Sequence, residues 1–229
     1  MNNKNGLPLS GSETLFTENK WSTTKGVRHN NCYSYAANNY SNTRVQKAVP
    51  GGMIAKREGR SPNYDAPLSC ANLVPKVVGD NPESVYRIAD VDAPCKQGFY
   101  KIMMFVDPGD DFDGDFHFYK QHKDVEYRVQ EGDTLQKIAR TFYVTVEYLR
   151  KHNPKVSSNA DLRPGTTKVF VPNVNAWSHK MGHATGALIT DSCGKIIKDP
   201  RKACRVYSHN YKNFCGGFCV RRNGDVKTV

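Results

Sequence analysis

Apolar residues along the chain gather in short runs, and two of these runs have the pattern of β-strands. Residues 100–106 form a mostly apolar run bounded by Gly98 and Pro108, which predicts a buried strand. Residues 116–121 alternate between apolar and polar positions, as expected for a second strand. The 12 Tyr and 10 Phe of the chain fit a protein rich in short strands.

Around these strands the pattern predicts one short helix and two irregular segments. Asn31 can cap a helix that begins at or just before Cys32 and continues through good helix formers. Residues 1–28 are polar with scattered apolar positions, which predicts an extended N-terminal arm. Residues 41–75 contain several Pro and Gly turn signals, which predict a long irregular loop.

A different pattern begins at Tyr127. Residues 127–139 read as a strand, then a Gly-Asp-Thr turn, then a helix with its apolar side facing inward. Residues 145–152 predict a second helix, which Asn153-Pro154 ends. Residues 168–172 predict a closing strand after a Pro-Gly turn. The order of elements is therefore strand, helix, helix, strand.

The residues of this segment resemble a LysM domain over 127–172. The resemblance rests on the Tyr-x-Val start, Gly-Asp-Thr-Leu, Ile-Ala, Leu-x-x-x-Asn-Pro and the Val-Phe-Val-Pro end. It implies a βααβ fold that binds N-acetylglucosamine-containing chains, peptidoglycan or chitin, in a shallow groove. By position, the glycan-binding residues would be Gly132, Asp133, Thr134, Leu135, Asn153 and Pro154. The alternative is that these residues only build the turn and the helix cap.

The LysM-like segment interrupts a larger unit. Removing it brings residues 117–120 next to residues 177–180, two strand-like pieces that can pair as a hairpin. Because the terminal strands of a βααβ module lie side by side, the module can replace a hairpin loop. We therefore expect a discontinuous host domain, residues 29–126 plus 173–229.

The host segments contain a candidate catalytic centre. A Cys at a helix start, a later His on a strand and a polar residue on the next strand occur in that order as Cys32, His117 and His179. A helix N-terminus and a nearby imidazole activate a thiol, and a third group fixes the tautomer of the imidazole. This order, and Asn-Cys-Tyr-x-Tyr-Ala, resemble the NlpC-type and CHAP-type papain-like cysteine hydrolases.

That resemblance implies an α+β fold with a papain-like antiparallel sheet. Cys32 would be the nucleophile, His117 the base and His179 the orienting residue. Two plainer interpretations stay open: Cys32 as a small buried apolar residue, and His117 as a hydrogen-bonded histidine of the sheet.

Two metal sites can also be drawn from the sequence, and neither has the expected spacing. A zinc site would combine ligands chosen from His179, His183, Cys193, Cys204, Cys215 and Cys219, but only the last two cysteines are close in sequence. The acidic residues between Asp107 and Asp115 lack the ligand order and closing Glu of a calcium loop, which favours a solvated loop. No metal and no cofactor is expected.

Cysteine count and charge add further expectations. Seven cysteines leave at least one unpaired, so we expect buried thiols, or one disulfide from Cys215 or Cys219, rather than a full disulfide framework. The net charge of +11 favours contact with polyanions. The first ten residues carry no leader pattern and no apolar run spans a bilayer, which predicts a virion or cytoplasmic protein, or one exported by a non-classical route.

Together these patterns predict a peptidoglycan-directed cysteine hydrolase, an endopeptidase or amidase, with a LysM glycan-binding module. The alternative is a non-enzymatic glycan-binding or virion structural protein with a degenerate hydrolase fold. The surroundings of Cys32 distinguish the two predictions. A sulfur within about 4 Å of the His117 imidazole in an open cleft would favour the enzyme, and a buried or disulfide-bonded Cys32 would favour the binding protein.

Overall fold

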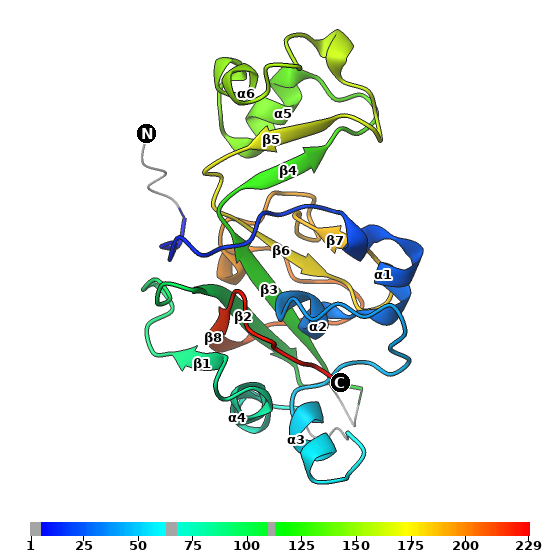
Figure 1. The fold of residues 1–229 in the computed structure, drawn as a ribbon, viewed down its shortest axis with the longest axis vertical. Coiled ribbons are helices and arrows are strands. Elements are labelled where there is room, and N and C mark those ends of the chain that lie inside the picture. The colour runs from blue at the N-terminus through cyan, green and yellow to red at the C-terminus, as the bar shows by residue number, and fades with distance from the viewer. Residues whose placement is uncertain (1–5, 63–67, 110–112) are drawn as a thin grey trace.

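A computed structural model describes residues 6–62, 68–109 and 113–229, and its strands form two separate antiparallel sheets (Figure 1). The larger sheet has the order β1 (Val85–Ile88), β8 (Asn213–Arg221), β2 (Phe99–Asp107), β3 (Asp115–His122), β6 (Ala176–Lys180) and β7 (Ala187–Leu188). The smaller sheet pairs β4 (Val125–Arg128) with β5 (Lys168–Val171). Within the described ranges, no helix is long and apolar enough to cross a membrane.

Six α-helices are described along the chain, with three short 3₁₀ turns. The α-helices are α1 (Thr24–His29), α2 (Cys32–Ala36), α3 (Gly52–Arg57), α4 (Cys70–Asp80), α5 (Leu135–Phe142) and α6 (Val146–His152). The 3₁₀ turns are η1 (Lys20–Ser22), η2 (Asn159–Asp161) and η3 (Pro200–Lys202).

The two predicted strands are confirmed as β2 and β3, which pair along most of their length. Because side chains of a strand alternate between faces, each strand contributes to two cores. One face packs Ile102, Met104, Val106, Phe116 and Phe118 with residues of α2 and α4. The opposite face packs Met103, Phe105, Tyr119, Trp177, Ile197 and Tyr211.

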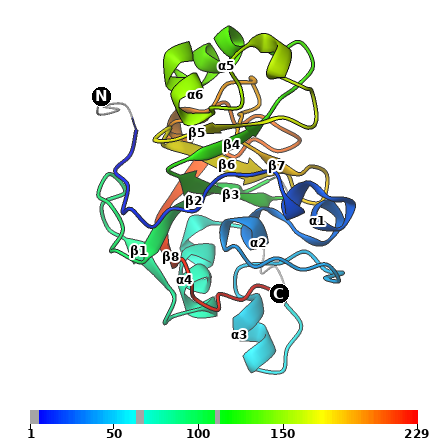
Figure 2. The same ribbon diagram turned by 45° about the horizontal axis from the view of Figure 1, so that its top comes forward.

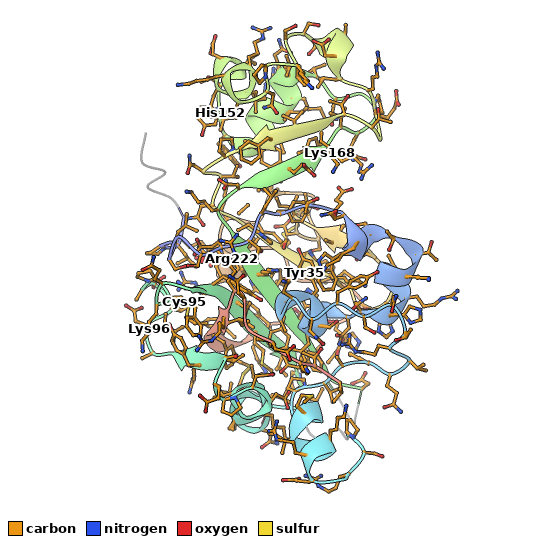
Figure 3. All side chains as sticks on the ribbon, viewed as in Figure 1. Tyr35, Cys95, Lys96, His152, Lys168 and Arg222 are labelled. Carbon is orange, nitrogen blue, oxygen red and sulfur yellow. A yellow bond between two sulfur atoms is a disulfide. The ribbon has the colours of Figure 1, made fainter. Side chains whose placement is uncertain are left out.

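The predicted helix start at Cys32 is confirmed. The Asn31 side chain accepts the amide of Ser34, and the Ser34 hydroxyl accepts the amide of Asn31, so two donors at the helix start are satisfied. Further along α2, the Tyr35 hydroxyl lies 2.6 Å from Ser178 Oγ on β6. Tyr35 lies near the centre of the molecule (Figure 3), and this contact fixes α2 against the sheet.

Two segments expected to be irregular contain helices. Residues 41–75 include α3 and the first half of α4, although residues 63–67 lie outside the described part of the chain. Ser69 caps α4 by accepting the amide of Asn72, and the apolar residues of α4 pack on the sheet. In the N-terminal arm, residues 24–29 form α1, and Phe16 and Trp21 are buried. Packing against the sheet supplies the stability that these short helices lack by themselves.

The prediction of buried thiols or at most one disulfide was wrong, and the predicted unpaired cysteine is confirmed. Disulfides join Cys70 to Cys215, Cys95 to Cys219 and Cys193 to Cys204, and Cys32 is the free thiol. The register of β2 and β8 shifts near Gly216, which has a φ of +113°. This bulge changes the alternation of side chains along β8, so Cys215 joins the core that contains α4 while Cys219 is paired with Lys101 of the opposite face.

The βααβ segment lies at the tip of the hairpin formed by β3 and β6. His122 is paired with Ala176 at the end of that hairpin, and Val125 is paired with Val171 at the start of the smaller sheet. Figures 1 and 2 show the smaller sheet with α5 and α6 at one end of the molecule, where Figure 3 labels His152 and Lys168. The smaller sheet is therefore joined to the larger one by two short connections, between β3 and β4 and between β5 and β6.

The N-terminal arm holds the βααβ segment against the larger sheet. The backbone of Phe16 hydrogen-bonds with Asp124 O at 2.9 Å and Glu126 N at 2.8 Å, which adds an extended segment to the edge of β4. Glu18 and Arg128 approach within 3.5 Å beside these bonds. The arm thus fixes the segment at a third point besides its two chain connections.

Candidate functional site

Two of the three predicted catalytic residues are in direct contact. Nε2 of His117 on β3 lies 2.8 Å from Nδ1 of His179 on β6, and Nε2 of His179 lies 3.0 Å from the carbonyl oxygen of Thr190. Both imidazoles are buried. The strand register explains the contact, because Tyr119 is paired with His179 and His117 is two residues away on the same face of β3.

These hydrogen bonds define the tautomer of both histidines. The carbonyl oxygen of Thr190 can only accept, so Nε2 of His179 carries a proton. Nδ1 of the neutral His179 ring then accepts, and Nε2 of His117 donates to it. The unprotonated nitrogen of His117 is therefore Nδ1, the nitrogen that a general base would use.

Cys32 lies against the part of β3 that carries His117. Its Sγ donates to the carbonyl oxygen of Phe116 at 3.5 Å, and the backbone amide of Phe118 hydrogen-bonds to the same sulfur. These two contacts flank His117 in the sequence. The structure thus places the sulfur of Cys32, at the N-terminus of α2, beside the backbone of β3 on either side of His117. The ring of His117 lies on the face of β3 that carries Tyr119, whereas Cys32 packs with Phe116 and Phe118.

Burial determines the protonation of these groups. Cys32 is 2% exposed, and desolvation, followed by the charge of Asp115, raises the pKa of its thiol to about 12. Desolvation lowers the pKa of His179 to about 4. Desolvation, with smaller effects of His179 and Lys47, holds the pKa of His117 well below its usual range. At neutral pH the resting site therefore has a neutral thiol and two neutral imidazoles.

Three tyrosines that the sequence did not single out surround the two histidines. Tyr211 stacks on His117 with ring centroids 4.9 Å apart, and Tyr119 packs edge-on against the same ring at 5.0 Å. Tyr207 lies 5.5 Å from the ring of His179. Tyr207 comes from an irregular segment, so no periodic pattern in the sequence points to it. The tyrosines keep both imidazoles away from bulk water.

The cysteines considered for metal binding, and two of the acidic residues, make other contacts. Cys193, Cys204, Cys215 and Cys219 are in disulfides, which removes them as thiolate ligands. Of the acidic loop, Asp110 and Asp111 lie outside the described residues. Asp115 pairs with Lys47, and Asp107 accepts the amide of Asn210 at 2.8 Å.

The polar residues predicted to bind glycan serve the backbone of the βααβ segment. The Asp133 side chain is 2% exposed, and its carboxylate accepts from the amide of Gln130 and the hydroxyl of Tyr127. Thr134 caps α5, and Asn153 bridges the carbonyl of Leu149 with both backbone groups of Phe170.

The other three predicted residues divide between surface and interior. Gly132 and Pro154 are exposed, whereas the Leu135 side chain is buried. Gly132 has a φ of +71°, which a residue without Cβ adopts easily. Any sugar contact at this turn therefore falls to exposed backbone and to neighbouring exposed side chains.

Asn159 joins the two segments that contain the predicted glycan-binding residues. Its Oδ1 accepts the amide of Leu135 at 2.8 Å, which ties the turn before α5 to the loop after α6. Asn159 is exposed and was missed at the sequence level, because its role depends on a contact across 24 residues.

Comparison with known families identifies the βααβ segment. Residues 127–167 match the LysM domain family. No curated protein and no solved structure matches the chain. The segment is thus a LysM domain, which implies binding to N-acetylglucosamine-containing glycans, peptidoglycan or chitin. The papain-like relationship predicted for the larger sheet has no support from these comparisons.

Proposed function

We propose that this protein is a peptidoglycan-directed cysteine hydrolase, an endopeptidase or amidase, whose LysM domain holds the glycan. The observation that carries the proposal is a pair of hydrogen bonds, one between His179 and the carbonyl oxygen of Thr190 and one between His117 and His179. Cys32 lies beside the strand segment that bears His117. A cysteine hydrolase needs a thiol, a base and a group that orients the base, and these residues supply all three.

The arrangement of elements supports a papain-like assignment for the larger sheet. A helix that begins at the candidate nucleophile packs on an antiparallel sheet, and the candidate base and orienting residue lie on neighbouring strands. The chain order of Cys32, His117 and His179 is the order of the NlpC-type and CHAP-type hydrolases.

The proposed reaction uses only groups of this site. Nδ1 of His117 takes the thiol proton as Sγ of Cys32 attacks a stem-peptide carbonyl carbon. The C–N bond breaks when His117 returns that proton to the leaving nitrogen, which leaves a thioester on Cys32. Water then loses a proton to His117 and attacks the thioester, so the acid product leaves and the thiol is restored. His179 holds the His117 ring in place and stabilises its charged form.

The LysM domain would raise the local concentration of stem peptides at Cys32. Binding one part of a polymer makes the next encounter intramolecular, and the gain depends on how firmly the two sites are connected. Here two chain connections and the backbone of Phe16 hold the domain against the larger sheet.

A second candidate function is a glycan-binding protein without turnover. The burial of Cys32 and its thiol pKa of about 12 favour it, since proton transfer to a base with a depressed pKa is costly. In that case the positive charge of the chain would serve contact with anionic wall polymers or nucleic acid.

The disulfides also bear on where the protein works. The described chain has three disulfides. Disulfides are common in proteins of oxidising environments and rare in a reducing cytosol. We therefore propose that the folded protein acts outside the reducing cytosol, at a cell surface or in a particle.

Two measurements on purified cell walls test the proposal. Wild type, Cys32→Ala and His117→Ala are compared for co-sedimentation with insoluble peptidoglycan and chitin and for loss of turbidity of a peptidoglycan suspension. All three should sediment with at least one polymer, and only wild type should clear the suspension. Sedimentation without clearing by wild type would support the second candidate.

A further inference from the structure

Basic side chains from three separate segments meet around the start of α2. Lys180 at the end of β6 donates from Nζ to the carbonyl oxygen of Val27 in α1 at 3.1 Å. His29, at the end of α1, donates from Nδ1 to the carbonyl oxygen of Arg44 at 2.7 Å. These contacts bring α1, the end of β6 and the segment after α2 to one place.

The electrostatic environment of His183 indicates how close these groups are. Burial lowers the pKa of His183, and the charges of Lys180, Lys47, Arg44 and His29 lower it further. The positive charges of these groups therefore add together in the surroundings of His183. We call the set Arg44, Lys47 and Lys180 the basic rim.

Two members of the basic rim, Lys47 and Lys180, also act on the candidate nucleophile. Lys47 and Lys180 both lower the pKa of Cys32, against the larger effects of desolvation and Asp115 that raise it. Asp115 is the carboxylate among these neighbours, and it forms an ion pair with Lys47. Among the described residues, the charged groups that act on Cys32 thus include the cations Lys47 and Lys180 and the carboxylate of Asp115.

The Lys47–Asp115 pair contacts both halves of the site. Nζ of Lys47 lies 4.8 Å from the ring centroid of Phe116, whose carbonyl accepts from Cys32. Asp115 accepts the hydroxyl of Tyr211 at 2.8 Å, and Tyr211 stacks on His117. The Lys47 side chain is 36% exposed and that of Asp115 18%, while Cys32 is buried. The ion pair thus lies between solvent and the buried site.

We infer that Lys47 is a specificity residue that binds a free carboxylate of the substrate, and that Asp115 occupies its place when no substrate is bound. The inference rests on the proposed function and names its substrate class: an acidic peptide with a carboxylate close to the bond that is cut. On binding, the substrate carboxylate replaces Asp115 at Lys47, while Asp115 keeps the hydroxyl of Tyr211. The remaining charges of the basic rim add to the attraction.

Alkylation of Cys32 tests this inference without requiring turnover. Cys32 is the free thiol, so each alkylated chain carries one label, counted by mass spectrometry under non-reducing conditions. Iodoacetate and iodoacetamide differ mainly in charge, and each forms a thioether with release of iodide. The ratio of their rates is measured for the native protein and for the same chain unfolded in denaturant.

We expect the iodoacetate to iodoacetamide ratio to be about fivefold higher in the native protein than in the unfolded chain. Lys47→Gln should abolish this preference, Lys47→Arg should retain it, and Asp115→Asn should increase it. Lys151→Gln, an exposed substitution on α6, is the matched control and should change nothing. Equal ratios in wild type and Lys47→Gln, or no labelling of the native protein by either reagent, would overturn the inference.

A second comparison separates this inference from the proposed function. Stem peptides with a free carboxylate are compared with the same peptides carrying a carboxamide. Cleavage of both at equal rates would overturn the role of Lys47 and leave the hydrolase standing. Cleavage of neither, with the alkylation preference intact, would remove the hydrolase and leave Lys47 as an anion-binding residue.

Discussion

Nε2 of His117 and Nδ1 of His179 are hydrogen-bonded at 2.8 Å although 62 residues separate them in the sequence. Most of the intervening residues form the LysM domain, which begins and ends at the tip of the hairpin that carries both histidines. The inserted domain leaves this contact in place because β3 and β6 pair directly with each other next to the insertion. The LysM domain is therefore joined directly to the two strands, β3 and β6, that carry the candidate catalytic pair.

Replacing His179 tests whether it positions His117. His179→Phe keeps an aromatic ring in the core but removes the acceptor for Nε2 of His117, so we expect peptide release to fall by about 10²–10⁴-fold. His179→Asn offers a carbonyl oxygen as acceptor and should retain part of the activity. A purely structural role would give the opposite order, with Phe the milder change. Circular dichroism on both variants checks that the fold is kept.

The buried histidines predict a loss of stability in mild acid. Burial lowers the pKa of His122 to about 3 and that of His179 to about 4, so the unfolded chain binds protons first as the pH falls. The contribution of these two histidines to the free energy of unfolding is complete above pH 6.5. Below that pH it decreases by about 1.4 kcal/mol per pH unit for each group. Urea unfolding at pH 7.5, 6 and 5 measures the slope. His122→Gln should flatten it, and an equal slope in wild type and variant would contradict this explanation.

The disulfides predict unequal losses of stability. Cys70–Cys215 closes a sequence separation of 145 residues and Cys193–Cys204 one of 11. Chain entropy alone gives about 5 kcal/mol for the first and about 3 kcal/mol for the second. Removing each pair by double substitution to Ala should lower the free energy of unfolding in that order. The reverse order would show that native contacts, rather than loop closure, decide the difference.

The hydrogen bond between Asn159 and the amide of Leu135 predicts that replacing Asn159 lowers glycan affinity. Asn159→Ala frees the amide of Leu135 and separates the two loops it joins, so affinity for N-acetylglucosamine oligomers should fall several-fold, with a loss of about 1 kcal/mol in LysM stability. Titration calorimetry measures the affinity. Asn42→Ala, an exposed position of the larger unit, is the matched control. Unchanged affinity in Asn159→Ala would place the glycan elsewhere on the domain.

The LysM domain could be predicted because its signals are local. Thr134 caps α5, Thr145 caps α6, and the chain turns away at Asn153, all within one short stretch of sequence. The start of α2 was predictable for the same reason, since Asn31 caps it from the adjacent position.

The remaining features depend on contacts between distant residues. Helices α3 and α4 follow Pro and Gly turn signals, and Pro75 lies inside α4, so the local pattern favoured a loop. The pairing of Cys70 with Cys215 and the role of the Thr190 carbonyl need the folded sheet to bring them together. Neither a count of cysteines nor a side-chain pattern contains that information.

The central claim is that Cys32 cleaves peptides of a wall polymer held by the LysM domain. Mass spectrometry of the fragments released from purified peptidoglycan by wild type and by Cys32→Ala tests it directly. We expect wild type to release peptides with new termini, and Cys32→Ala to bind the same material and release none. Equal release by both proteins would contradict the claim.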